Sequence, residues 1–240
     1  NVNATGTLNL LELTKKYCPS APFIFMSTNK VYGDNPNRLN IIEKKTRWEL
    51  KKNDKYFKGI DEKFSIDNCT HSFFGVSKSY ADLITQEYGK NVGLKTVCFR
   101  GGCLTGPNHS GAKLHGFLSY LVKISLAKKK YSLIGYKGKQ VRDNLHSHDL
   151  VNAFWEFFKK PTSGEVYNMG GGRYSNCSII EALDLVEEIA NIKIKRDILK
   201  KPRVGDHIWY ISNLSKFKKH YPNWKQKYNT KKIIKELIGI

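Results

Sequence analysis

The stretch from Pro22 to Asp34, Pro-Phe-Ile-Phe-Met-Ser-Thr-Asn-Lys-Val-Tyr-Gly-Asp, changes character at its middle. Its first half is continuously apolar, which is typical of a strand buried on both faces of a parallel sheet. Its second half is polar and prone to turns. A strand that ends in Ser27, Thr28 and Asn29 brings two hydroxyls and an amide to the carboxyl edge of the sheet, where open α/β folds bind their ligands. We therefore predict that this stretch forms the floor of an active site.

Strands alternate with amphipathic helices along the rest of the chain, which predicts an α/β fold with a mainly parallel sheet. A second apolar strand, 96–99, runs into Arg100-Gly101-Gly102-Cys103, so two polar strand ends should meet at one edge. Ser178 and Glu181 form a capping box that starts a helix. The predicted helices cover 1–16, 77–88, 114–127, 150–158, 182–189 and 231–238, and the remaining predicted strands cover 131–134 and 165–169.

The bulk composition indicates a globular protein of one large or two modest domains. The chain has 240 residues, of which 40% are hydrophobic. No apolar run approaches the ~20 residues that span a bilayer, and the first residues do not resemble a signal peptide. The five cysteines are widely spaced and never form C-x-x-C, which favours free thiols over disulfides or a zinc site. We expect a cytoplasmic protein with no membrane segment and no bound metal.

The formal charge of +20 would favour nucleic-acid binding if the lysines gathered on one element among aromatic residues. They are instead spread over many segments, in short runs such as Lys128-Lys129-Lys130, together with acidic residues. A solvated, lysine-rich surface is the simpler interpretation. The alternative is an electrostatic field that attracts an anionic nucleotide ligand. We expect no nucleic-acid partner.

The segment 36–69 is polar and lysine-rich and has no clear period, although it contains Trp48, Tyr56 and Phe57. Loops of this length in compact domains are usually functional or disordered. We predict a partly ordered insertion near the site.

Several short motifs occur together in a fixed order. They are Gly-Thr-Leu-Asn-Leu-Leu-Glu at 6–12, Ser-Thr-x-x-Val-Tyr-Gly at 27–33, aromatic-Gly-x-Ser-Lys at 74–78, Val-Arg-Asp-x-x-His-x-x-Asp-Leu at 141–150, Glu-Val-Tyr-Asn-x-Gly-Gly at 165–171 and Arg-x-Gly-Asp at 203–206. This combination resembles the extended short-chain dehydrogenase/reductase family of nucleotide-sugar epimerases and dehydratases. The longer strings 103–111 and 135–146 are most similar to family members that epimerise a CDP-hexose at C2.

The resemblance implies a Rossmann-like NAD-binding domain with a smaller α/β domain that binds the nucleotide sugar. It assigns 1–107 and 142–172 to the first domain, with the insertion at 36–69, and 108–141 and 173–240 to the second. The expected enzyme is an isomerase: NAD would oxidise the sugar to a ketone and return the hydride to the other face. The expected substrate is a CDP-hexose, and a UDP- or dTDP-sugar epimerase or dehydratase is the alternative within the family.

The resemblance also implies catalytic roles. Thr28 would hydrogen-bond the reacting oxygen, and Lys78 would bind the cofactor ribose and lower the pKa of the base. That base is a tyrosine in the family, four residues before the lysine, but this chain has Phe74 there. A phenyl ring has no proton to exchange. Either another group is the base, or the chemistry differs from the family's usual path, or the protein binds nucleotide sugars without turning them over.

Five other groups near these motifs could exchange the proton. His71 and His109 rank first because histidine titrates near neutrality. Cys103, Tyr32 and Tyr56 are the further candidates.

The resemblance places further residues against the two ligands. The guanidinium groups of Arg142 and Arg203 suit phosphate oxygens, and ion pairs with the nearby Asp143 and Asp206 are the alternative. For Cys103, a small buried hydrophobic residue is the favoured interpretation, because free cysteine is among the most buried residue types. The expected cofactor-binding residues are Ser27, Lys78, Arg100, Gly101 and Cys103, and the expected substrate-binding residues are Thr28, Asn29, Asn108, His109, Arg142, Arg203 and Asp206.

The glycine-rich turn that receives the NAD pyrophosphate in this family does not occur in the sequence. Gly170-Gly171-Gly172 follows a late strand and has the wrong spacing to replace it. We expect the chain to be a fragment that lacks the front half of its cofactor domain and is poorly competent alone. The full-length protein is expected to be a homo-oligomer.

Overall fold

The computed structural model describes residues 1–112, 116–199, 201 and 205–240. Its central element is a parallel sheet of three strands in the order β1-β4-β8. The strands are β1 (Phe23–Thr28), β4 (Thr96–Gly101) and β8 (Glu165–Met169). Every residue of β4 is buried, as expected for a strand covered on both faces. The predicted α/β fold with a parallel sheet is confirmed.

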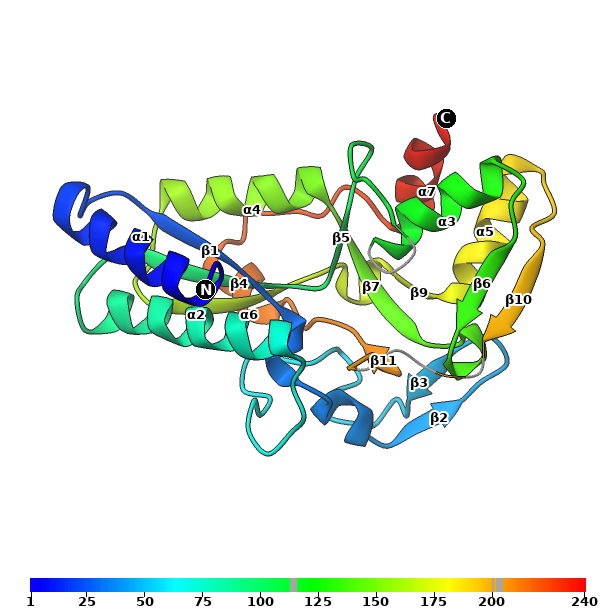
Figure 1. Ribbon diagram of the computed structural model, residues 1–240. Coiled ribbons are helices and arrows are strands. Elements are labelled where there is room, and N and C mark those ends of the chain that lie inside the picture. The colour runs from blue at the N-terminus through cyan, green and yellow to red at the C-terminus, as the bar shows by residue number, and fades with distance from the viewer. Residues whose placement is uncertain (113–115, 200, 202–204) are drawn as a thin grey trace.

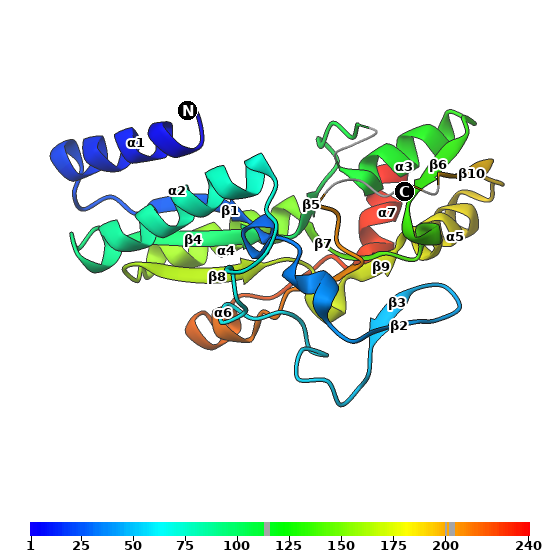
Figure 2. The same cartoon turned by 60° about the horizontal axis from the view of Figure 1, so that its bottom comes forward.

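Helices cover both faces of this sheet (Figure 1, Figure 2). They are α1 (Ala4–Tyr17) and α2 (Phe73–Lys90) on one side, and α4 (Ser147–Lys159) and α6 (Ser215–His220) on the other. Successive side chains of β4 point to opposite faces of the sheet, so the strand contributes to an apolar cluster on each face. Cys98 packs with Ala81 of α2, whereas Phe99 packs with Phe157 of α4 and Phe217 of α6. Burying a side chain of this size is worth about 1.5–3 kcal/mol.

The second part of the molecule lies beyond the carboxyl ends of these strands (Figure 1). Its strands are β5 (Cys103–Thr105), β6 (Tyr131–Ile134), β7 (Val141–His146), β9 (Asn176–Ser178), β10 (Arg196–Leu199) and β11 (Trp209–Tyr210). Its helices α3 (Phe117–Leu126), α5 (Ile179–Ala190) and α7 (Thr230–Ile238) enclose a second apolar core with β6. The predicted division into two domains stays a prediction.

Several predicted elements have the predicted bounds, and others do not. β6 and β8 match, and the Ser178–Glu181 capping box is present at the start of α5. Helix α2 begins at Phe73, four residues before the predicted start, because the Ser72 hydroxyl caps it by accepting the N–H of Gly75. None of the helices described is long and apolar enough to cross a membrane.

The insertion 36–69 is packed more extensively than the sequence predicts. It forms a short turn, Asn35–Arg38, and a hairpin of β2 (Ile41–Glu43) and β3 (Trp48–Leu50). Leu50 and Ile60 are buried with Tyr210 in a third apolar cluster. The insertion is therefore part of the folded body.

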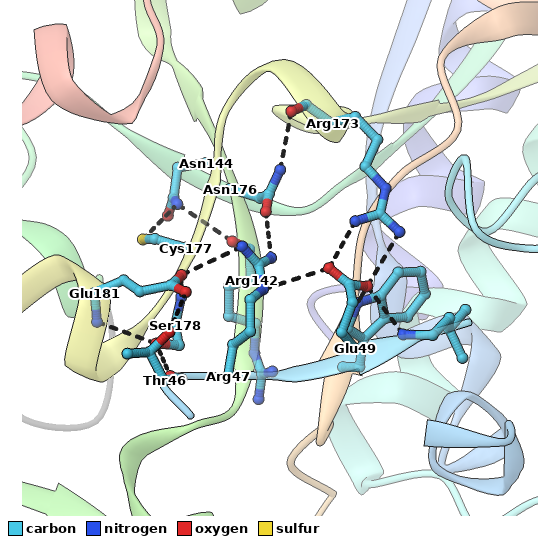
Figure 3. Close-up of polar contacts among 12 residues, drawn as sticks. Thr46, Arg47, Glu49, Arg142, Asn144, Arg173, Asn176, Cys177, Ser178 and Glu181 are labelled. Atoms are coloured by element: carbon cyan, nitrogen blue, oxygen red, sulfur yellow. Dashed lines mark hydrogen bonds and ion pairs between the residues drawn. The ribbon is translucent and has the colours of Figure 1, made fainter. Parts of the chain in front are cut away.

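Ionic contacts fix the hairpin to the second part of the molecule (Figure 3). Arg47 lies between Glu49 and Glu181, at N–O distances of 3.4 and 3.3 Å. Arg173 holds both carboxylate oxygens of Glu49, at 2.8 and 3.1 Å. The indole N–H of Trp209 donates to the same carboxylate at 2.9 Å. Burial opposes ionisation of Glu49, but Arg173, the backbone N–H of Leu50 and the charge of Arg47 together outweigh it and lower the pKa of this carboxyl.

The Glu49 contacts should make stability depend on pH. A carboxyl whose folded pKa lies below its unfolded value stabilises the protein above the unfolded pKa, near 4.5, and this contribution is lost as the pH falls through the folded pKa. We expect Glu49→Gln to lower the free energy of unfolding by about 2 kcal/mol at pH 7. The difference should shrink in urea titrations below pH 4.5. Glu188→Gln, which breaks only an exposed pair with Lys231, is the control and should show no such trend.

Candidate active site

The carboxyl ends of β1 and β4 meet as predicted. Ser27 lies opposite Arg100, and Thr28 lies opposite Gly101. Adjacent strand residues point to opposite faces, so Ser27 and Thr28 have different surroundings. The Thr28 hydroxyl accepts the backbone N–H of Lys30 at 3.2 Å and thereby caps the 3-10 turn that follows β1. Thr28 therefore stands at the point where the buried strand becomes a turn.

Lys78 comes to the same edge from helix α2. Its ammonium donates to the backbone carbonyl of Met26 at 2.8 Å and lies 4.7 Å from the centre of the Phe25 ring. Burial lowers the pKa of Lys78. An ammonium has three N–H donors, and the structure describes one acceptor for them. Two donors remain for the hydroxyls of a ribose, so the group fits a cofactor sugar.

Phe74 occupies the family tyrosine position, one turn before Lys78 on α2. The residue is 49% exposed, so it borders solvent at this end of the helix. The side chain that fills the position carries no titratable group.

The two histidines predicted as bases are held by other groups. The Nε2 of His71 donates to the carbonyl of Val31 at 2.7 Å, and its Nδ1 lies 3.7 Å from the Cys69 sulfur. The Nδ1 of His109 lies 3.3 Å from the Ser119 hydroxyl of α3. The contacts described for these two rings are with Val31, Cys69 and Ser119.

The remaining candidate bases are also poorly suited. Burial raises the pKa of the Cys103 thiol to about 11 and that of the Tyr32 phenol to about 12, so both stay protonated at neutral pH. Tyr32 is fully buried and donates to Asn168. Tyr56 lies in the insertion with its ring edge against Phe64.

Ser27 and Arg100, which the resemblance places against the cofactor, belong to a buried network. The Ser27 hydroxyl donates to Asp82 of α2 at 2.5 Å. The Arg100 guanidinium donates to both oxygens of the same carboxylate, at 3.0 and 2.9 Å. It also donates to the Tyr32 hydroxyl at 3.0 Å. Both side chains are under 7% exposed. Their polar atoms are used to join strands and helix, which argues against contact with a ligand.

Arg142 and Asp206 form a mostly buried ion pair at 2.6 Å. The guanidinium also donates to the carbonyl of Val141. The ion pair given above as the alternative for Arg142 is therefore present. Arg203, the other predicted phosphate ligand, lies outside the described residues.

The segment 205–208 is fastened to the turn that follows β1. Lys30 donates to the carbonyl of Gly205 at 2.9 Å, and buried His207 donates to that of Gly33 at 2.8 Å. Burial lowers the pKa of His207 well below its usual value, and the charges of Lys30 and Arg142 act in the same direction. Sequence reasoning missed Lys30 and His207, because neither has a local signal that points to the other segment.

The other predicted ligand residues lie around this edge. Asn29 is buried, with its side chain 3.5 Å from the Thr28 hydroxyl. Cys103 begins β5, and Asn108 is exposed in the turn after that strand. Among the residues described, no cluster of His, Cys, Asp and Glu could hold a metal ion.

Gly170 and Gly171, the first two of the three glycines after β8, allow close packing of the backbone. A Cβ atom on Gly170 would lie 2.2 Å from the Asp143 carboxylate, and one on Gly171 would lie 2.0 Å from the carbonyl of Ser175. The backbone approaches its neighbours too closely for any side chain at these positions.

Comparison with known proteins agrees with these motifs. Residues 1–170 match the model of the NAD dependent epimerase/dehydratase family. The chain is 30% identical over 244 residues to CDP-paratose 2-epimerase of Salmonella typhi, covering 98% of this chain and 69% of that protein. It is 31% identical over 197 residues to dTDP-D-glucose 4,6-dehydratase of Dictyostelium discoideum, covering 80% of this chain and 39% of that protein.

A solved structure shows the same fold. The dTDP-glucose 4,6-dehydratase of Bacillus anthracis, in complex with NAD, superposes with a TM-score of 0.76 at 27% identity. The match covers 98% of this chain and 66% of that one. The chain thus spans about two thirds or less of the length of two of these three relatives. It belongs to the NAD dependent epimerase/dehydratase family, the NAD-dependent extended short-chain dehydrogenases/reductases that its motifs predict.

Proposed function

We propose that this chain carries the catalytic edge of an NAD-dependent nucleotide-sugar epimerase that inverts CDP-paratose at C2. The observation that carries the proposal is the contact between the Lys78 ammonium and the carbonyl of Met26, two residues before Thr28. It brings the cation and the hydroxyl of the family motif to one strand end. The sequence likeness to the Salmonella typhi enzyme supports the choice of substrate.

In this proposal NAD, when bound, supplies the hydride acceptor and donor. Lys78 binds the cofactor ribose through its two remaining N–H donors, and its charge favours loss of the proton from the reacting hydroxyl. Thr28 donates a hydrogen bond to the oxygen on which negative charge develops. Arg142 is the phosphate ligand of the nucleotide, for which it would exchange its contact with Asp206.

Epimerisation is favoured over dehydration by the residues at the strand end. Elimination of water from a sugar needs an acid that protonates the departing hydroxyl. After Thr28 the chain continues with Asn29 and Lys30, which carry no carboxyl group. The Asp143 carboxylate, next to Arg142, is buried and accepts the backbone N–H groups of Gly172 and Ser212.

The complete gene product that contains this chain is the material for the test. We expect it to retain NAD through purification and to convert CDP-paratose to its C2 epimer, followed by proton NMR of the sugar. Bound NAD without epimerisation of any CDP-, UDP- or dTDP-hexose would contradict the catalytic proposal.

The substitution Phe74→Tyr distinguishes an enzyme that has its own base from a binding protein that has lost its base. An enzyme with its own base should change by less than about tenfold, whereas a binding protein that lost its base should gain activity by about 100-fold or more.

The proposal includes a cytoplasmic homo-oligomer. Helices α1 and α2 lie side by side and expose apolar side chains that a second copy could cover, namely Leu10, Leu13, Val76, Tyr80 and Leu83. A complete gene product that sediments as a monomer at micromolar concentration would contradict this part.

A further inference from the structure

A surface cavity of about 400 Å³ lies beside α6 and shares no lining residue with the candidate active site. It is bordered by α6, the 3-10 turn Gly172–Tyr174 and the segment 222–226. None of its lining residues is a predicted contact of NAD or of the nucleotide sugar. They are Tyr174, Lys218, Pro222, Trp224, Lys225 and Gln226. The cavity is therefore a separate candidate site.

The floor of this cavity is held in place by the core of the protein. Trp224 is 3% exposed, and its indole N–H donates to the backbone carbonyl of Asp149 in α4 at 2.9 Å. The Trp224 ring also packs edge-on against Phe217, with the ring centroids 5.2 Å apart. The Gln226 amide donates to the backbone carbonyl of Gly171 at 3.0 Å. A ligand would meet a preformed surface, so little ordering would oppose its binding.

Two lysines at the cavity carry charges that no carboxylate balances. Neither Lys218 nor Lys225 forms an ion pair with any residue that the structure describes. By contrast, Lys216 on the same helix pairs with Glu165 at 2.6 Å. Partial burial lowers the pKa of Lys218, and the charge of Lys225 acts in the same direction. The two ammonium groups thus repel each other, and a bound anion would offset this repulsion.

Tyr174 adds an aromatic side chain to the wall of the cavity. It is the last residue of the 3-10 turn, and it is 48% exposed. An accessible aromatic ring can stack on a planar ligand ring, and such stacking tolerates rings of different chemistry. No acidic residue lines the cavity, so nothing in its wall repels an anion. The cavity therefore offers two positive charges beside one flat apolar face.

We propose that this cavity binds a phosphate ester of a small planar ring compound, with the phosphate at Lys218 and Lys225 and the ring on Tyr174. Lysine binds phosphate as a compact point charge. A phosphate monoester has a charge of about −2 at neutral pH, which matches two ammonium groups, whereas a carboxylate would balance only one of them. The site does not depend on the proposed function, since none of its side chains takes part in the proposed catalysis.

The test measures AMP binding by calorimetry on the complete gene product, with NAD and CDP present so that the ligand sites of the proposed enzyme are filled. AMP should bind, and Lys218→Met and Lys225→Met should each weaken its binding about fivefold. Tyr174→Ala should weaken AMP binding about fivefold or more and leave the binding of inorganic phosphate unchanged. The three side chains are exposed, so each variant should melt within about 2 °C of the wild type.

Lys219 provides the matched control, since it is exposed on the same helix but is not a lining residue of the cavity. Lys219→Met should bind AMP within about twofold of the wild type. Wild-type affinity for AMP in both Lys218→Met and Lys225→Met would overturn the inference, as would failure of the wild type to bind AMP at millimolar concentration. Adenosine binding as tight as that of AMP would overturn the phosphate contact. Inorganic phosphate binding as tight as that of AMP, with no effect of Tyr174→Ala, would overturn the ring contact.

Discussion

Replacing Lys78 with methionine should lower epimerisation by the complete gene product by about 100-fold or more. Methionine keeps an apolar stem over the Phe25 ring but removes the ammonium that donates to Met26 and, in our proposal, to the cofactor ribose. Without that charge, loss of the proton from the reacting hydroxyl becomes harder, and the cofactor is held less tightly. Turnover of CDP-paratose and the NAD content after purification measure the two effects.

Lys90 on the same helix gives the control for this substitution. It contacts Gln86 at the far end of α2, so Lys90→Met should leave turnover and NAD content at the wild-type level. If Lys78→Met retained both properties while folding normally, the proposed role of the ammonium would be wrong.

Replacing Asp82 with alanine should lower the free energy of unfolding by about 3–5 kcal/mol, because it leaves a buried charge without its partner. The Asp82 carboxylate is 1% exposed and is held by the Arg100 guanidinium, the Ser27 hydroxyl and the Gln86 amide. Arg100 would remain inside the sheet with its charge uncompensated. Urea unfolding followed by circular dichroism measures the loss.

An exposed aspartate serves as the comparison for Asp82. Asp184 makes a surface pair with Arg196 at 3.5 Å, and Asp184→Ala should change the free energy of unfolding by less than about 1 kcal/mol. Equal effects of the two substitutions would show that the buried network contributes no more than a surface pair.

Local patterns predicted the elements whose cause is local. The apolar run of β1, the strand β8 before its glycines and the Ser178–Glu181 cap all depend on residues close in sequence. Strand β7 was missed because Arg142, Asp143 and Asn144 look like a loop, although all three are buried. Asp143 accepts the backbone N–H groups of Gly172 and Ser212, and Arg142 pairs with Asp206. These partners lie far along the chain, so no local pattern reveals them.

The sequence predicted which strand ends meet at the candidate site better than it predicted the contacts of single side chains there. The meeting of Thr28 with Gly101 followed from two strands of one parallel sheet. The resemblance implies a cofactor contact for Ser27 and a contact with the reacting oxygen for Thr28, and the alternation of strand side chains places the Ser27 hydroxyl against Asp82. The proton carrier was not predicted, since the choice among five candidates depends on long-range contacts.

The attachment of the segment 205–208 bears on how ligand preference could evolve in this fold. Asn37 donates from its amide to the backbone carbonyl of Asp206 and accepts the backbone N–H of Ile208, at 2.9 and 2.7 Å. Lys30 likewise binds the backbone of Gly205. These anchors use main-chain atoms of the segment, so they survive a change of its side chains. The segment could therefore exchange residues to suit a new ligand while its path over the strand end stays the same.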